Sequence, residues 1–190
     1  MRLTVLEEAG GWQVALLQKV LGFTPSLAAV RHYRPEFFGK HYAAVLRQAL
    51  RRGEAWSRGD LELMAAFVSS RNQCEAATRS HGAVAALYLG KEKVRQVLGD
   101  YLTAPISEPL RATLVFVEKV TLLPSEVGGD DIQRLRRAGI SEQGIREALL
   151  VCFVTAITDR LAESFGFEPA AEGAQKSLAF LSRFVGYRAG

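Results

Sequence analysis

The stretch from Asp60 to about Ser70 constrains the fold most, because its residues are apolar around most of a helix circumference. A helix with that pattern is expected to be buried rather than to lie on a surface. Ser57 and Asp60 have the spacing of a capping box, which marks the start of this helix. Glu62 is therefore unusual, since it is an acidic residue near the start of a helix whose other residues are expected to be buried.

The rest of the chain also has helical periodicity, interrupted by glycine and proline. No segment shows the sustained alternation of a strand, and the glycine patterns of dinucleotide- and phosphate-binding loops are missing. The sequence therefore predicts an all-α fold. The expected helices cover about 12–21, 25–33, 35–50, 60–70, 74–89, 91–98, 107–123, 131–138, 145–165 and 171–187.

The composition limits the size and the compartment of the protein. With 190 residues, 48% of them hydrophobic, the chain can bury a full core as one domain or as two small lobes that divide near 103–109. No apolar run approaches the ~20 residues that span a bilayer, and residues 1–8 lack the hydrophobic block of a signal peptide. Two cysteines are too few for a disulfide framework, so we expect a cytoplasmic protein without a membrane partner.

The net charge of +4 permits nucleic-acid binding but does not favour it. The densest basic cluster is Arg47, Arg51 and Arg52, at the end of an expected helix, where cations stabilise the helix C-terminus. No nucleic-acid-binding motif accompanies them. We therefore expect a structural role for these arginines and no nucleic-acid partner.

The segment 69–81 is the one place where the sequence suggests chemistry. It holds Cys74, one of two cysteines, and His81, one of three histidines. Seven residues make about two helical turns, so the two side chains share a face if the helix is continuous. Asn72 is the expected N-cap, and Glu75 the residue that completes a capping box. Cys74 would then lie in the first turn, where the helix dipole favours a thiolate.

Each of the three candidate site residues has a structural explanation as well. Cys74 is either a reactive thiolate or a small buried residue. His81 is either a general base, since the ordinary histidine pKa of ~6.5 suits proton exchange near neutral pH, or a structural side chain. Glu62 either orients His81 or accepts a proton, with a pKa that burial would raise, or it is a first-turn glutamate favoured by the helix dipole.

The second cysteine and the other histidines are weaker candidates. Cys152 lies in an apolar run and is expected to pack as a small hydrophobe; the alternative is a distant thiol that resolves an oxidised Cys74. His32 and His41 lack acid or thiol partners at a useful spacing, so we expect them to lie on the surface or in an interface. The motif lacks the paired ligands of a zinc site. We expect neither a metal nor a cofactor.

The order Glu62, Asn72, Cys74, Ala77, His81 resembles the carboxymuconolactone decarboxylase superfamily, in its alkylhydroperoxidase D-like, peroxidase-related branch. That branch typically has a glutamate followed twelve residues later by Cys-x-x-Cys-x-x-x-His, and both intervals fit here. The flanking segments 33–36, 65–70, 131–141 and 158–162 are also similar, so the resemblance covers about 12–168. It implies an alkylhydroperoxidase D-like helical bundle that forms one domain over 1–190, with a C-terminal helix at about 171–187. It also implies a homo-oligomer, commonly a trimer or hexamer.

Ala77 departs from the family pattern. In the peroxidase members the second cysteine attacks the peroxide and the first resolves the disulfide, and Ala77 occupies the second position. Cys74, His81 and Glu62 remain as catalytic candidates, but a disulfide between positions 74 and 77 is impossible. The resemblance implies a peroxidase or oxidoreductase that uses a single cysteine, a Glu–His proton relay and a small-molecule substrate. The alternatives are decarboxylase or lactone-type chemistry, which needs no cysteine pair, and a non-catalytic oligomeric protein that binds a ligand.

Overall fold

The computed structural model describes residues 39–167 continuously, together with 19, 36, 169–171, 173–174, 177 and 179–180. Across this part the chain forms α-helices and one short 3-10 helix, and no strand. The prediction of an all-α fold is confirmed. The helices expected over 12–21, 25–33 and 171–187 lie wholly or largely outside the described residues, as does His32.

The helices follow one another with short connections. Most of the helices begin and end within a few residues of the expected positions, because capping residues and glycines near their ends can be recognised in the sequence. None of the described helices is both long enough and apolar enough to cross a membrane. The elements are α5 (Lys40–Arg51), α6 (Arg58–Arg71), α7 (Glu75–Leu89), α8 (Lys91–Asp100), α9 (Glu108–Leu122), η1 (Pro124–Glu126), α10 (Gly129–Arg137) and α11 (Glu142–Phe165).

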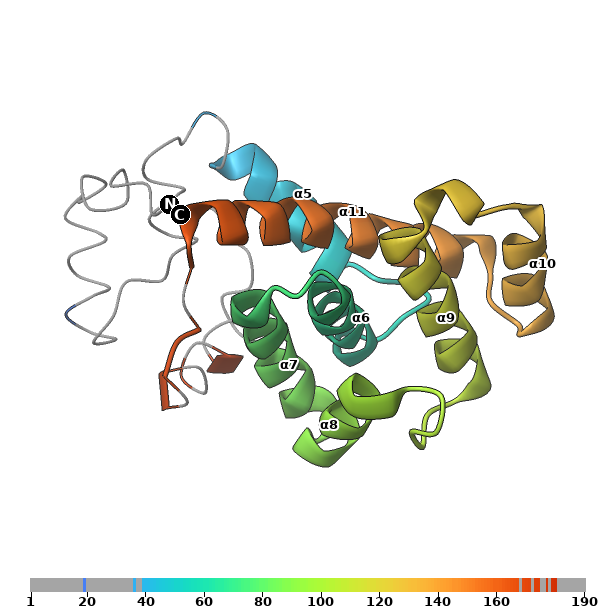
Figure 1. Ribbon diagram of the computed structural model, residues 1–190, viewed down its shortest axis with the longest axis horizontal. Helices are drawn as coiled ribbons and strands as arrows, with labels where there is room; N and C mark the ends of the chain where they lie inside the picture. Colours follow the sequence, from blue (N-terminus) through green and yellow to red (C-terminus); the bar gives the residue numbers. More distant parts are fainter. Residues whose placement is uncertain are drawn as a thin grey trace.

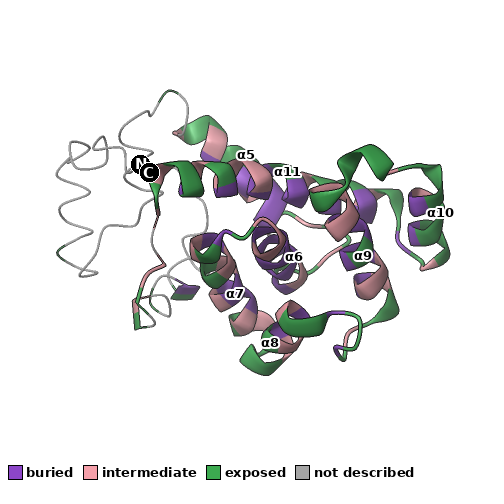
Figure 2. Ribbon diagram, in the orientation of Figure 1, coloured by how far each residue is buried: buried purple, intermediate pink, exposed green. Residues whose placement is uncertain are grey.

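Helix α6 lies at the centre, in contact with α5, α7, α8, α9 and α11 (Figure 1). Every residue from 61 to 69 is buried, so α6 is covered on all sides (Figure 2). Ser57 accepts a hydrogen bond from the Asp60 N–H, and the Asp60 carboxylate accepts one from the Ser57 N–H. The expected capping box and the burial of this helix are confirmed. The same burial places the carboxylate of Glu62 inside the core.

Helix α11 holds the connection between α5 and α6 in place. The carboxylate of Glu147 accepts hydrogen bonds from the N–H groups of Glu54 at 2.7 Å and of Ala55 and Trp56 at 3.2 Å. The indole N–H of Trp56 donates to the carbonyl of Gly144 at 2.9 Å. These contacts satisfy the backbone of the connecting loop, which would otherwise be left unpaired in a half-buried position. They also fix the end of α5 beside the start of α6.

The start of α6 packs closely on the end of α7. A Cβ atom at Gly59 would lie 2.8 Å from the Tyr88 Cβ and 2.8 Å from the Leu89 Cγ. Real Cβ atoms essentially never approach so closely, so the two helices meet at a distance that only glycine allows. The close approach brings α7, which carries His81, against the buried acid of α6.

Candidate active site

A tight turn joins α6 to α7 and places Cys74. Asn72 ends α6, Gln73 has a φ of 61°, and Cys74 is the N-cap of α7. The left-handed region is uncommon for a residue with a side chain and indicates a backbone that its surroundings hold in place. The Cys74 N–H donates to the Ser69 carbonyl at 2.9 Å. The turn therefore fixes the thiol at the junction of the two helices.

This turn corrects the expected capping of α7. Asn72 is not the N-cap; it closes α6, and its side chain donates to α11 instead. Glu75 does not complete a capping box, since its carboxylate pairs with Arg79 one turn later. The left-handed Gln73 is the physical reason, because it delays the start of α7 beyond the expected position.

Cys74 is fully buried. Burial, with a smaller contribution from the carboxyl groups of Asp159 and Glu163, raises the pKa of its thiol to about 12, although the backbone N–H of Ala77 opposes this. The expectation that the helix start favours a thiolate is therefore wrong, because burial and two acidic neighbours outweigh the dipole. The thiol packs against Ala77, Ala162 and Phe167.

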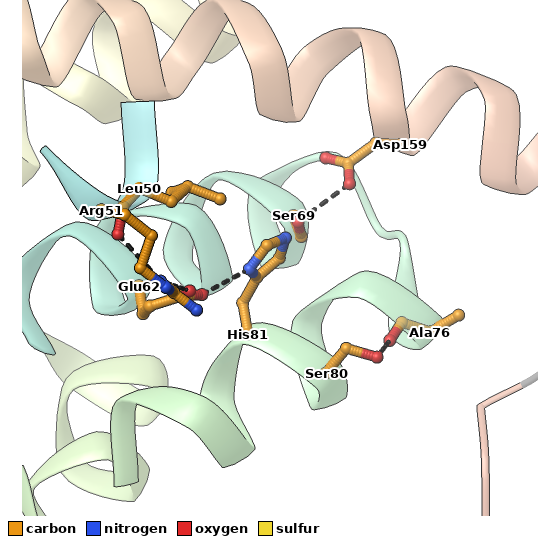
Figure 3. Close-up of polar contacts among 8 residues, drawn as sticks. All are labelled: Leu50, Arg51, Glu62, Ser69, Ala76, Ser80, His81 and Asp159. Carbon is orange, nitrogen blue, oxygen red and sulfur yellow. Dashed lines mark hydrogen bonds and ion pairs between the residues drawn. The ribbon is translucent and has the colours of Figure 1, made fainter. Parts of the chain in front are cut away.

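His81 and Glu62 form a buried pair, as Figure 3 shows. The Nδ1 of His81 lies 2.7 Å from the Oε2 of Glu62, whose side chain is 0% exposed. Burial raises the pKa of Glu62, but the hydrogen bond and charge of His81 and the charge of Arg51 outweigh it, so the pKa lies below its ordinary value. An ionised carboxylate can only accept hydrogen bonds, so Nδ1 of His81 carries a hydrogen. Nε2 is therefore the nitrogen of His81 that is left to take up or release a proton.

Arg51 is a site residue that the sequence interpretation missed. Its guanidinium contacts the Oε1 of Glu62, and its side chain is 7% exposed. Arg51 lies in the last turn of α5, as expected, and the structure adds an ion pair with the buried acid of α6. Nothing in the spacing of two residues on different helices could have revealed the pair.

Asp159 of α11 is the second site residue that was missed. Its Oδ1 accepts a hydrogen bond from the Ser69 hydroxyl and its Oδ2 one from the Asn72 amide, both at 2.8 Å (Figure 3 shows the first). Burial raises the pKa of Asp159, and the contacts with Asn72, Ser69, His81 and Cys74 only partly oppose this. Asp159 therefore lies within electrostatic range of both His81 and Cys74. An acid inside a largely apolar helix was the available signal, the same one that singled out Glu62.

The remaining sequence candidates lie apart from these residues. Cys152 is buried in the main core around α6, whereas Cys74 belongs to a separate cluster, and both are free thiols. Asp159 follows Cys152 by two turns of α11, about 10 Å along the helix. His41 is exposed on α5. Within residues 39–167 and the short pieces around them, no group of three histidine, cysteine or acidic side chains gathers as a metal site.

The sequence matches no protein-family model and no curated protein. Solved structures do match. A peroxidase-related protein from Ralstonia eutropha JMP134, described as an alkylhydroperoxidase AhpD core, has a TM-score of 0.74 at 24% identity and covers 95% of this chain and 90% of its own. The chain has the AhpD-core fold. The predicted alkylhydroperoxidase D-like bundle is confirmed.

Two other solved structures share this AhpD-like fold. A peroxidase-related protein from Silicibacter sp. TM1040 has a TM-score of 0.74 at 24% identity, with 84% of each chain covered. The debrominase Bmp8 has a TM-score of 0.69 at 17% identity, and the match covers 92% of this chain and 90% of that one. The resemblance to the carboxymuconolactone decarboxylase superfamily thus holds for the fold.

Proposed function

We propose that this protein is a thiol-dependent oxidoreductase in which Cys74 reacts and His81 moves protons. The observation that supports this most is the set of contacts that runs from Arg51 through Glu62 to His81, beside which Asp159 interacts electrostatically with both His81 and Cys74. Each member is buried or nearly so, which strengthens its interaction with the next. A histidine that a carboxylate orients is the kind of base that activates a nucleophile within its reach.

A hydroperoxide is the proposed oxidant. The thiol of Cys74 loses its proton to a neighbouring base, and the sulfur attacks the terminal oxygen of the hydroperoxide. The O–O bond breaks, a sulfenic acid forms on Cys74, and the departing alkoxide takes up a proton to leave as an alcohol. His81 is suited to supply that proton from Nε2, while Glu62 stabilises the charged imidazole.

The oxidised enzyme needs an external reductant, because Ala77 offers no second thiol within the motif. Two molecules of a small thiol return the sulfenic acid to Cys74, with release of one disulfide and one water. We infer that turnover with a dithiol reductant is weak. The proposal includes a single domain over 1–190, a cytoplasmic location and a homo-oligomer such as a trimer or hexamer.

A second candidate function is acid–base chemistry at His81 that does not involve the thiol, such as a decarboxylase or lactone-type reaction. Two observations favour it: Cys74 is fully buried with a raised pKa, and Ala77 replaces a thiol. A neighbour with the same fold is a debrominase, and its cysteine-to-alanine variant binds 2,3,4-tribromopyrrole. The fold is therefore used beyond peroxide reduction.

Peroxide consumption by matched cysteine variants tests the proposed function. We expect hydrogen peroxide and cumene hydroperoxide to be consumed slowly in the presence of a monothiol, with loss of this activity in Cys74→Ser and no change in Cys152→Ser. His81→Gln should reduce the rate by about 10²-fold or more. Peroxide consumption that Cys74→Ser leaves intact, or none above the rate without protein, would contradict thiol chemistry and favour the second candidate.

A further inference from the structure

Asp159 is the acidic side chain that lies between the Cys74 turn and His81. It is 2% exposed, and each of its oxygens receives one hydrogen bond, from Ser69 and from Asn72. A carboxylate has about four acceptor positions, so acceptor capacity remains on each oxygen. These two hydrogen bonds hold the turn that contains Gln73 in its left-handed conformation. They leave Asp159 free to accept a further proton.

Cys74 packs against α11, the helix that carries Asp159. Ala162, one helical turn after Asp159, packs against Cys74. Ser69 and Asn72, which both donate to the Asp159 carboxylate, precede Cys74 in the chain, and the Cys74 N–H donates to the Ser69 carbonyl. Only the thiolate is an effective nucleophile, so a buried neutral thiol must pass its proton to an acceptor before it attacks. The ring nitrogen of His81 that does not contact Glu62 points toward Ser69 and Asp159 in Figure 3.

We propose that Asp159 is a catalytic residue that accepts the Cys74 proton and passes it to His81. This role rests on the proposed function at Cys74. In the reaction with a hydroperoxide the S–H proton moves to an Asp159 oxygen, and the sulfur electron pair forms the new S–O bond as the O–O bond breaks. The departing alkoxide takes a proton from Nε2 of His81, and the proton on Asp159 replaces it. No charge is left behind in the buried site.

The groups around Asp159 suit such an acceptor. Asp159 interacts electrostatically with His81 on α7, with Tyr42 on α5 and with the Cys74 thiol in the turn, and Glu163 of α11 interacts in the same way with the thiol. Burial holds the pKa of Asp159 above its ordinary value, which brings the carboxyl nearer to the thiol in proton affinity. A carboxylate with that property transfers a proton in both directions more readily than an exposed one.

The rate of Cys74 modification by methyl methanethiolsulfonate, measured against pH in a Cys152→Ser background, tests this role. The double variant Asp159→Asn/Asn72→Asp exchanges the carboxylate and the amide across their 2.8 Å hydrogen bond, so the turn stays held while position 159 loses its base. We expect a nearly flat rate between about pH 7 and 9 with Asp159, and a rise of about tenfold per pH unit in the double variant, because the thiol then titrates alone. Ser69→Ala, which removes a donor but keeps the carboxylate, should remain flat.

A rate of Cys74 modification that does not change with pH in the double variant would overturn the role and leave Asp159 with the structural task of holding the turn. A tenfold rise of this rate per pH unit in the protein that keeps Asp159 would overturn it as well. Asp159→Asn alone is the second variant and must show the same slope, with retention of helix content by far-UV circular dichroism. A thiol that the reagent never modifies in the native enzyme would also overturn it. If Cys74 shows the flat profile but hydroperoxides do not oxidise it, the proposed function fails while the role of Asp159 stands.

Discussion

The carboxylate of Glu62 lies between two basic side chains inside the core, with His81 on one oxygen, at 2.7 Å, and Arg51 on the other. Its position follows from α6, which is buried on every side and carries Glu62 in its first turns. A buried charge of this kind is stable only when it is paired. The pairing in turn orients the imidazole and sets which of its nitrogens exchanges protons.

Arg51→Met should be strongly destabilising, because it leaves the carboxylate of Glu62 with one partner fewer in a fully buried position. We expect a loss of about 3 kcal/mol in the free energy of unfolding, measured with urea. Arg52→Met is the matched control, since Arg52 is the next residue and is exposed; it should change the free energy by less than about 0.5 kcal/mol. Equal losses in the two variants would contradict a buried pair at Arg51.

The sequence predicts much of this fold because its main determinants are local. The apolar circumference of α6, the capping box at Ser57 and the stop at Gly166 each act within one helix, and the structure has all three. The roles of Arg51 and Asp159 depend on how α5 and α11 pack against α6, which spacing along the chain does not specify. The same limit explains the capping of α7, where Gln73 takes a conformation that its residue type does not favour.

Glu147→Gln should lower stability at neutral pH, because Glu147 accepts the backbone N–H groups of the loop at 54–56. Burial raises the pKa of Glu147, but these hydrogen bonds and the one from Gln143 bring it below its ordinary value. A lowered pKa contributes stability that is present above the unfolded value of about 4.3 and is lost as the pH falls through the folded value. We expect a loss of about 1–3 kcal/mol at pH 7 that shrinks below about pH 4.

Urea unfolding of the wild-type and Glu147→Gln proteins at several pH values measures this difference. Glu54→Gln changes an exposed glutamate of the same loop, and its effect should stay small at every pH. A wild-type advantage over Glu147→Gln that persists undiminished in acid would show that the ionised carboxylate is not what holds the loop.

Two glycine substitutions should have opposite effects on stability. Gly59→Ala places a Cβ 2.8 Å from Tyr88 and Leu89, so α6 and α7 must separate, at a net cost of about 1–2 kcal/mol. Gly99→Ala adds a methyl group in open space near the end of α8 and should stabilise by up to about 1 kcal/mol through helix propensity. Thermal unfolding compares the two directly. A stabilising Gly59→Ala would mean that the two helices do not meet this closely.

Ala77→Cys should create a dithiol site. Ala77 is the third residue of α7 and lies in the same buried cluster as Cys74, its N-cap, so the two sulfurs would lie about one turn apart. We expect loss of two free thiols on mild oxidation, together with peroxide turnover supported by dithiothreitol at least tenfold above wild type. Ala76→Cys adds a thiol one position earlier and should give neither. If Ala77→Cys forms the disulfide without any gain in turnover, the remaining site does not support peroxide chemistry.

The formation of a sulfenic acid on Cys74 tests the central claim most directly. The Cys152→Ser protein is exposed to hydrogen peroxide in the presence of dimedone, and the adduct is followed by intact mass and located by peptide mapping. We predict a single adduct on Cys74 whose rate of formation falls by about 10²-fold in His81→Gln. A Cys74 that stays unmodified while the protein is folded, or that reacts equally fast without His81, would contradict a thiol oxidation that depends on proton transfer by the Glu62–His81 pair.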